Sequence, residues 1–366
     1  MENLDKYRKD IDEIDKKMIS LFEKRMETAR KIGEYKIKNN LSVLNAKREQ
    51  TVIDKCIENL ENKNLAKYAK EFTKDVMSIS RAYQSDISKT ETVIAFQGIE
   101  GSFSYEASLK FAQQKNKVKM IHFDTMGEIF EAVKEGKCDY GVLPFENSTT
   151  GAVTDVYDFV LKNDFYITNE ILVKVSQNLL ANKGAHLKDI KEVYSHPQAI
   201  MQSKSFLDSL DIKVVPYLNT AMSAKMVADS KRCDIAAIGG ENAAKIYGLN
   251  VLCPNINYNS LNFTKFVVIA KNEEYSDKND KISAILWLEH KVGALGEIIK
   301  IFTKHKINLL KLESKPDTEN PFEYMFFVDF TGNINDENVK EAMRELKKDT
   351  KKVKYLGNYK SAEVTK

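Results

Sequence analysis

The sequence has few of the residues that mark secreted or membrane-spanning proteins. Only four cysteines occur in 366 residues, and their wide spacing gives neither a disulfide framework nor a metal-type pair. No run of 18 apolar residues is present, and the polar first residues lack a signal-peptide pattern. These absences predict a cytoplasmic protein without a membrane partner, whose cysteines remain thiols.

An excess of positive charge is also missing. The 56 lysines and arginines stand against 53 acidic residues, a net charge of +3, so charge does not point to nucleic acid as a partner. The length predicts two or three domains, and an apolar content of 43% is enough for sizeable cores.

Residues 1–88 contain no proline and one glycine, Gly33, which predicts an all-helical segment with further helices near 45–59 and 64–86. Arg25 interrupts an apolar seam along the first helix, and burying an unpaired charge costs several kcal/mol, so it is a candidate anion ligand. A snorkelling arginine at the edge of a helix pair is the alternative. The seam consists of Leu4, Tyr7, Ile11, Ile14, Met18, Leu21 and Ile32.

The polar residues of this segment, in their order and spacing, resemble those of the all-helical chorismate mutases. The resemblance implies rearrangement of chorismate to prephenate, a pericyclic reaction that needs no metal or cofactor. The implied substrate-binding set is Arg8, Arg25, Lys36, Asn45, Arg48, Glu49, Ser80 and Gln84.

The resemblance also implies a role for each of these residues. The three arginines would hold the substrate carboxylates, while Lys36 and Gln84 would be the catalytic donors to the breaking ether bond. Glu49 and Ser80 would position the ring hydroxyl or the neighbouring cation. Asn45 stands where related bacterial fusion enzymes often have an aspartate, and an amide can still donate or accept there.

The distance between two of the arginines predicts a dimer. Arg8 and Arg25 are 17 residues apart on one helix, about 25 Å along its axis, which is too far for both to bind one small dianion. If both bind it, Arg8 must come from a second protomer, so shared mutase sites are expected.

Polar loops follow several predicted strands in the middle of the chain. In an open α/β sheet, ligands bind outside the carboxyl ends of the strands, so these loops are expected to form one polar site. An ordinary strand-to-helix loop, in which Ser148 or Thr149 caps a helix, is the alternative for any one of them. The loops lie at 96–104, 144–151, 195–199, 217–221 and 238–240.

Three of these loops carry the patterns P-x-E-N-S-x-x-G, S-H-P-Q-A and N-T-A-x-S-A, in that order. With residues 262–266, they resemble the prephenate dehydratase family over 92–270. The resemblance points to Thr264 as the catalytic proton donor and to Lys265 as the partner of a carboxylate, where the family usually has an arginine. Substrate would be oriented or packed by Ser102, Glu146, Asn147, Ser148, Ser195, Gln202, Lys265 and Phe266.

The alternation of strands and helices in 92–270 predicts two α/β lobes with a ligand between them, similar to periplasmic-type binding proteins. First-lobe strands are expected near 92–97, 118–122 and 139–143, alternating with helices near 103–115, 125–135 and 152–161. An extended run near 165–176 leads to second-lobe strands near 192–195, 213–217 and 234–238, and the chain returns at 263–270.

A polar linker is predicted at 271–280, followed by a βαββαβ pattern over 281–358, an α+β ferredoxin-like unit. The unit contains the motifs Gly293-Ala294-Leu295, Ile307-Asn308-Leu309 and Glu313-Ser314-Lys315-Pro316. They resemble the ACT regulatory domain of phenylalanine-sensitive dehydratases, although Lys315 replaces the family's arginine and Val292 replaces a common proline. A purely structural dimerisation module is the alternative. The implied phenylalanine site comprises Gly293, Ala294, Leu295, Asn308, Leu309, Glu313 and Ser314.

Taken together, the segments 1–88, 92–270 and 281–358 resemble bifunctional chorismate mutase/prephenate dehydratases, which make phenylpyruvate for phenylalanine synthesis. The expected partners are chorismate, prephenate and phenylalanine, with no cofactor and at least a dimer. A dehydratase with a weak mutase domain and a non-catalytic amino-acid sensor are the alternatives.

Overall fold

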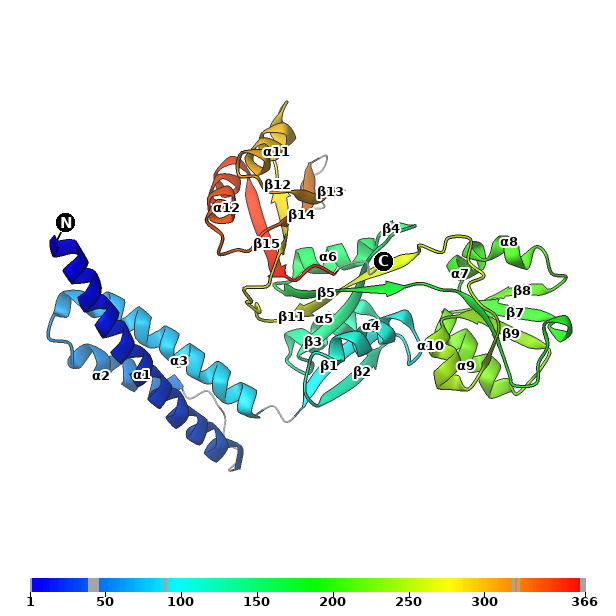
Figure 1. The fold of residues 1–366 in the computed structure, drawn as a ribbon, viewed down its shortest axis with the longest axis horizontal. Helices are drawn as coiled ribbons and strands as arrows, with labels where there is room; N and C mark the ends of the chain where they lie inside the picture. Colours follow the sequence, from blue (N-terminus) through cyan, green and yellow to red (C-terminus); the bar gives the residue numbers. More distant parts are fainter. Residues whose placement is uncertain (1, 39–45, 89–90, 318–319, 321–322, 363–366) are drawn as a thin grey trace. The chain divides into compact units, whose positions relative to one another are not determined.

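The computed structural model describes residues 2–38, 46–88, 91–317, 320 and 323–362. The chain folds as two compact units, Met1–Glu91 and Thr92–Lys366 (Figure 1). No helix in the described ranges is both long enough and apolar enough to cross a membrane.

The first unit is helical, as the absence of proline predicts. α1 (Glu2–Lys38) has 37 residues, and α3 (Ala66–Ser88) packs along it. α2 (Ala46–Glu58) packs on α3, which follows a 3-10 turn, η1 (Lys63–Leu65). Each of the three α-helices contributes a buried apolar side chain: Ala29, Ile53 and Met77.

The apolar seam predicted along α1 lies on the surface of the single chain. All seven of its residues keep 44% to 64% of their area exposed: Leu4, Tyr7, Ile11, Ile14, Met18, Leu21 and Ile32. Burying one large apolar side chain is worth about 1.5–3 kcal/mol, so this stripe is a surface whose coverage would stabilise the unit considerably.

The second unit begins with a first lobe built on a mixed sheet of order β2-β1-β3-β11-β5. β1 is parallel to β2 and β3, whereas β11 returns from later in the chain and is antiparallel to both neighbours. The strands are β1 (Thr92–Gln97), β2 (Val118–Phe123), β3 (Tyr140–Asn147), β4 (Gly151–Ala152), β5 (Tyr166–Lys174) and β11 (Phe263–Ala270). The helices are α4 (Phe103–Ala112), α5 (Met126–Lys134) and α6 (Thr154–Lys162).

The second lobe is inserted between β5 and β11, so two segments of chain join the lobes. Its sheet has the order β10-β6-β9-β7-β8. The strands are β6 (Asn178–Ala181), β7 (Glu192–Ser195), β8 (Lys213–Pro216), β9 (Ile235–Gly239) and β10 (Asn250–Cys253). The helical segments are η2 (Leu187–Asp189), α7 (Pro197–Gln202), α8 (Lys204–Leu207), α9 (Thr220–Ser230) and α10 (Glu241–Tyr247).

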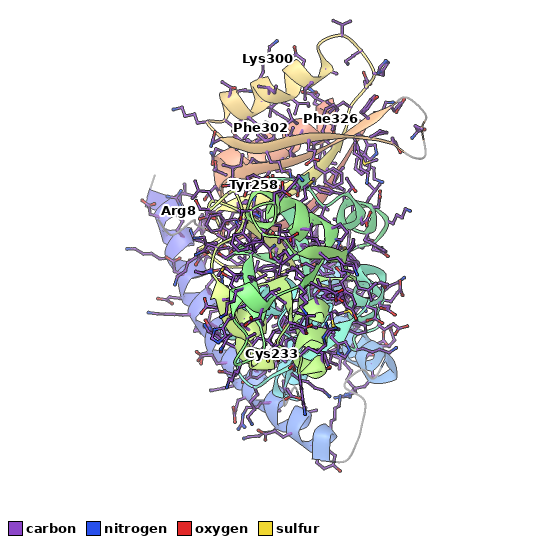
Figure 2. The ribbon with its side chains drawn as sticks, turned by 90° about the vertical axis from the view of Figure 1, so that its right-hand side faces the viewer. Arg8, Cys233, Tyr258, Lys300, Phe302 and Phe326 are labelled. Atoms are coloured by element: carbon purple, nitrogen blue, oxygen red, sulfur yellow. The ribbon has the colours of Figure 1, made fainter. Side chains whose placement is uncertain are left out.

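The C-terminal domain has the predicted βαββαβ order and an antiparallel sheet, β13-β14-β12-β15. Phe302 packs between helix and sheet, 5.0 Å from the ring of Phe330, and Phe326 packs against the same cluster (Figure 2). The elements are β12 (Lys281–Trp287), α11 (Ala294–Lys304), β13 (Leu309–Pro316), β14 (Tyr324–Thr331), α12 (Glu337–Asp349) and β15 (Lys352–Tyr359). The expected fold class, helical then two-lobed α/β then ferredoxin-like, is confirmed.

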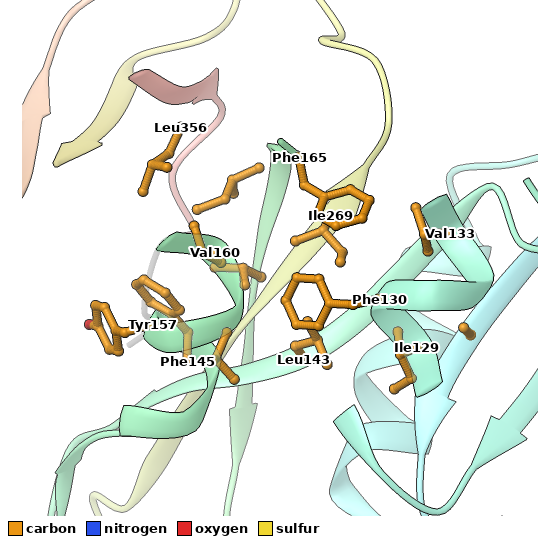
Figure 3. Close-up of a cluster of buried hydrophobic side chains, with 14 of the residues drawn as sticks. Ile129, Phe130, Val133, Leu143, Phe145, Tyr157, Val160, Phe165, Ile269 and Leu356 are labelled. Atoms are coloured by element: carbon orange, nitrogen blue, oxygen red, sulfur yellow. The ribbon is translucent and has the colours of Figure 1, made fainter. Parts of the chain in front are cut away.

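The C-terminal domain and the first lobe share one hydrophobic core. The ring of Tyr157 on α6 meets that of Phe327 on β14 at 4.4 Å, nearly edge to face. Leu356 of β15 joins the same cluster as Phe145 and Val160 of the first lobe (Figure 3). The two domains therefore pack as parts of one body.

Polar contacts reinforce this junction. Lys281, buried in β12, pairs with Glu170 of β5 at 2.6 Å and with Asp329 of β14 at 2.9 Å. The segment 271–280, expected to be a polar linker, is also held in place, since Asn279 is 8% exposed and donates to the Asn358 carbonyl at 2.8 Å. The end of this polar segment is therefore fixed to β15.

Candidate functional site

A cleft of about 290 Å³ lies between the two lobes. It is at the carboxyl ends of β3, β7 and β8, where the polar loops of the sequence were expected to meet. The lining residues from the first lobe and the connecting segments are Phe103, Pro144, Asn147, Thr150, Val153, Val175, Gln177 and Thr264, and those from the second lobe are His196, Gln198, Ala199, Gln202, Asn219 and Thr220.

The cleft suits an anion although none of its described lining residues is a lysine or an arginine. The N-termini of α4 and α9 open onto it, at Phe103 and at Asn219 with Thr220. A helix N-terminus carries free backbone N–H groups and a partial positive charge, both of which favour negative groups. An anionic ligand would therefore be held by neutral donors and helix ends.

Asn147 and Thr264 form a hydrogen-bonded pair on the wall of this cleft. The Asn147 Nδ2 donates to Thr264 Oγ1 at 3.0 Å and to Asn262 Oδ1 at 2.7 Å. Its Oδ1 accepts from the backbone N–H groups of Thr149, at 2.9 Å, and Thr150, at 3.1 Å. Because Thr264 Oγ1 accepts from Asn147, its own proton remains available to a ligand.

Glu146 and Lys265 do not line the cleft. They pair with each other at 3.1 Å, and Glu146 also pairs at 3.2 Å with Lys311 of the C-terminal domain. Burial would raise the pKa of Glu146, but the ion pairs with Lys265 and Lys311 outweigh it and hold that pKa below its usual value. Of these two charges, Glu146 thus contacts the C-terminal domain, and Lys265 is paired with Glu146.

The other predicted residues of this site divide into two groups. Gln202 lines the cleft, whereas the three serines make structural contacts. Ser195 Oγ donates to a carbonyl of β9 at 2.8 Å, and Ser102 caps the N-terminus of α4. Ser148 Oγ donates to the Leu261 carbonyl at 3.1 Å. Phe266 was expected to pack against the ligand ring. It is 2% exposed and lies instead in a hydrophobic core beneath the sheet.

Several lining residues were not among the predicted ligands. His196, Asn219 and Thr220 belong to the quoted loop motifs, so their position after strands was the signal that could have identified them. Gln177 has no such signal, because it lies in a segment that crosses between the lobes and approaches the cleft only when both lobes are folded.

In the helical unit, two residues of the predicted substrate-binding set, Arg25 and Ser80, are in contact. The Arg25 Nη1 donates to Ser80 Oγ and, at 3.2 Å, to the Val76 carbonyl. Ser80 is 5% exposed, so the guanidinium is anchored at the junction of α1 and α3.

The remaining predicted residues of this unit are spread along its helices. Arg8 pairs with Asp5 at 3.3 Å near the start of α1, with its side chain 69% exposed. Lys36 lies near the end of α1 and Arg48 on α2. Asn45 lies outside the described residues, as do the side chains of Glu49 and Gln84.

In the C-terminal domain, a pocket of about 160 Å³ lies at the start of α11. It is lined by Ala294 and Leu295, after Gly293, whose φ of +85° suits the tight turn. Asn308, Leu309, Glu313 and Ser314 do not line it. Glu313 Oε2 lies instead 3.1 Å from Lys311 Nζ and accepts from the Tyr157 hydroxyl at 3.4 Å, at the junction with the first lobe.

Comparison with protein families divides the chain in the same order. The family models for chorismate mutase type II, prephenate dehydratase and the ACT domain match residues 7–85, 94–274 and 283–348. A solved prephenate dehydratase from Arthrobacter aurescens in complex with L-Phe is 28% identical with a TM-score of 0.67, covering 74% of this chain and 90% of that one.

Curated relatives match almost the whole chain. The bifunctional chorismate mutase/prephenate dehydratase of Aquifex aeolicus is 32% identical over 99% of both chains. That of Escherichia coli strain K12 is 30% identical, covering 98% of this chain and 96% of the relative. The chain therefore belongs to the family of bifunctional chorismate mutase/prephenate dehydratases.

Proposed function

We propose that the interlobe cleft is the prephenate dehydratase site of this bifunctional enzyme and that Thr264 is its proton donor. The chain rearranges chorismate to prephenate and then converts prephenate to phenylpyruvate, in phenylalanine synthesis. The cleft suits the second reaction because the helix N-termini that open onto it favour a negatively charged ligand, and Asn147 and Thr264 stand together on its wall.

The dehydratase reaction needs one proton. The bond from the ring to its carboxylate breaks and releases CO₂, the electron pair completes the aromatic ring, and the bond to the ring hydroxyl breaks. The departing hydroxide takes a proton and leaves as water. Thr264 supplies that proton and regains one from solvent, while Asn147 occupies a lone pair of Thr264 Oγ1 and thereby directs its proton to the substrate.

The hydrogen bond from Asn147 to Thr264 carries this assignment, and the hydroxyl of Thr264 is the group to test. Thr264→Val should lower kcat for prephenate about 100-fold or more, because positioned proton donors typically contribute 10²–10⁴-fold. Thr264→Ser should keep most of the activity. Chorismate loss, followed in the same preparations, is the internal control, and a Val variant as active as the wild type would reject the assignment.

We further propose that mutase sites are shared in a dimer, with Arg25 and Ser80 from one protomer and Arg8 from the other. The exposed stripe on α1 supports a second copy as the covering surface, and the distance between the arginines requires one. Arg8→Ala and Arg25→Ala chains, each inactive alone, should recover mutase activity in verified heterodimers. Heterodimers without any recovery would count against shared sites.

Phenylalanine is the effector of the C-terminal domain, and we propose that it binds at the start of α11 and bridges two such domains. The pocket at Ala294 and Leu295 supports the location, and the edge strand β13 supports a neighbour beside it. The coupling free energy between an effector site and a substrate site is typically about 1–3 kcal/mol and is reciprocal. Prephenate analogues should therefore weaken phenylalanine binding by the same factor by which phenylalanine weakens theirs. Prephenate kinetics unchanged by saturating phenylalanine would reject it.

A cytoplasmic location is part of the same proposal. All four cysteines are free thiols, as a reducing compartment would keep them. Cell fractionation followed by immunodetection tests it, and recovery of the protein outside the cytoplasmic fraction would contradict it.

A further inference from the structure

The segment that joins β5 to β6 presents a glutamine to the cleft in a fixed position. The backbone N–H of Gln177 donates to Asn257 Oδ1 at 3.0 Å, and its carbonyl accepts from the Ile256 N–H at 2.8 Å. Gln177 lines the cleft and is 3% exposed. These two hydrogen bonds hold the main chain of Gln177 in place.

The carboxamide of Gln177 is incompletely satisfied. Its Oε1 is buried without a hydrogen-bond partner, whereas Asn147, another buried amide that lines the cleft, is bonded at both ends. A buried acceptor without a partner costs free energy comparable to a lost hydrogen bond. A ligand group that donates to this oxygen would remove that cost.

Prephenate offers few donors. In its doubly ionised form both carboxylates and the ketone only accept hydrogen bonds, and the ring hydroxyl is its single donor. That hydroxyl is also the group that must leave, and Thr264, its proposed proton donor, lines the same cleft. An unpaired acceptor on a residue that lines this cleft therefore matches one atom of the substrate.

We propose that Gln177 Oε1 accepts the proton of the ring hydroxyl and so determines that the enzyme selects a hydroxylated ring. This inference rests on the proposed dehydratase site. With its proton directed at Gln177, the hydroxyl oxygen presents a lone pair to Thr264. As the C–O bond breaks and the oxygen gains a second proton, its O–H becomes more acidic, so the hydrogen bond to Gln177 strengthens in the transition state.

The test uses two ring-saturated prephenate analogues that cannot aromatise, one with and one without the ring hydroxyl. Inhibition constants against prephenate would be measured for the full-length wild type and for Gln177→Met, which keeps the side-chain length and removes the acceptor. The wild type should prefer the hydroxylated analogue by about 10-fold or more. Gln177→Met should bind the two analogues almost equally, through weaker binding of the hydroxylated one.

Gln198→Met is the matched control, because Gln198 also lines the cleft but its Nε2 has a partner, donating to Thr150 Oγ1 at 3.4 Å. It should keep the preference for the hydroxylated analogue. Gln177→Asn, which keeps an amide but withdraws it by one carbon, should lose the preference and provides a second variant if Gln177→Met folds poorly. Chorismate loss and thermal unfolding monitor integrity.

The outcomes separate this inference from the site assignment. A Gln177→Met protein that keeps the wild-type preference, or a wild type without one, would overturn the role of Gln177. Equal loss of affinity for both analogues would assign Gln177 a structural role and overturn it as well. Both analogues could instead inhibit every cleft variant, including Thr264→Val, as strongly as they inhibit the wild type. That result would reject the cleft as the dehydratase site.

Discussion

Adjacent residues on two paired strands serve two different surfaces. Asn147 is paired with Thr264 and Glu146 with Lys265 in the register of β3 and β11. Successive side chains of a strand point to opposite faces, so the first pair lines the cleft and the second contacts Lys311 of the C-terminal domain. The motif P-x-E-N-S thus combines an amide that lines the cleft with a carboxylate that contacts the C-terminal domain.

The lowered pKa of Glu146 predicts how its contribution to stability depends on pH. A carboxyl whose folded pKa is depressed stabilises the fold above its unfolded pKa, and this stabilisation is lost as pH falls through the folded pKa. Glu146→Gln should therefore lower the unfolding free energy by roughly 1 kcal/mol at neutral pH, a value typical of partly exposed pairs. Urea unfolding across the acid range should show the two proteins converging as pH falls, whereas a gap that widens would contradict the ion-pair account.

The cysteines should differ in reactivity. Burial, with a smaller effect from Asp139, raises the pKa of the Cys138 thiol to about 11, and its side chain is 2% exposed. Cys233 is exposed (Figure 2). The thiolate is the reactive form, so an alkylating reagent should modify Cys233 rapidly and Cys138 only after unfolding. Peptide mass mapping over time measures both, and equally fast modification of the folded protein would contradict the burial of Cys138.

At the scale of elements, many residues of the cleft could be predicted from the sequence because its loops contain short motifs of polar residues directly after strands. Asn147, Thr264 and Gln202 were chosen from motifs, and all three line one cleft. Lys265 belongs to the same motif as Thr264 but does not line the cleft, because neighbouring residues of a strand point to opposite faces; its role toward a substrate carboxylate stays a prediction. Gln177 could not be found, because its place depends on how two lobes meet rather than on its neighbours in sequence.

The junction of β15 with β5 depends on a glycine. Gly357 has a φ of +147°, and a Cβ on it would lie 2.2 Å from the carbonyl oxygen of Ile167. Gly357→Ala should force the two strands apart and destabilise the second unit, and we expect a loss of about 2–4 kcal/mol, near the upper end for single substitutions. Gly136→Ala is a suitable control, since its φ is also positive but no atom lies within 4 Å of the added carbon. Comparable melting temperatures for the two variants would contradict the close approach.

At the scale of the whole molecule, Lys311 links the C-terminal domain to β3, the strand that carries the cleft residue Asn147. Its Nζ lies 3.2 Å from Glu146, whose strand neighbour is Asn147, and it donates to the Tyr157 hydroxyl at 2.5 Å. A shift of β13 on effector binding would act first on this contact.

Lys311→Met should therefore uncouple regulation from binding. Phenylalanine should still bind, as measured by calorimetry, but its inhibition of the dehydratase should weaken about 5-fold or more, within the usual range of coupling energies. Lys300→Met is the control, because Lys300 lies on the exposed face of α11 and pairs only locally, with Glu297 at 2.7 Å. Inhibition as strong in Lys311→Met as in the wild type would exclude this contact from the coupling.

The shared core limits how the enzyme can be freed from feedback control. Cutting the chain before β12 would remove Ile285, Met325, Phe327 and Leu356 from a cluster that also holds Leu143 of β3, and would expose the apolar side of α6. The truncated enzyme should then aggregate or lose prephenate turnover instead of becoming a deregulated catalyst. Variants that overproduce phenylalanine should therefore arise from substitutions that weaken its inhibition of the dehydratase while the C-terminal domain stays intact.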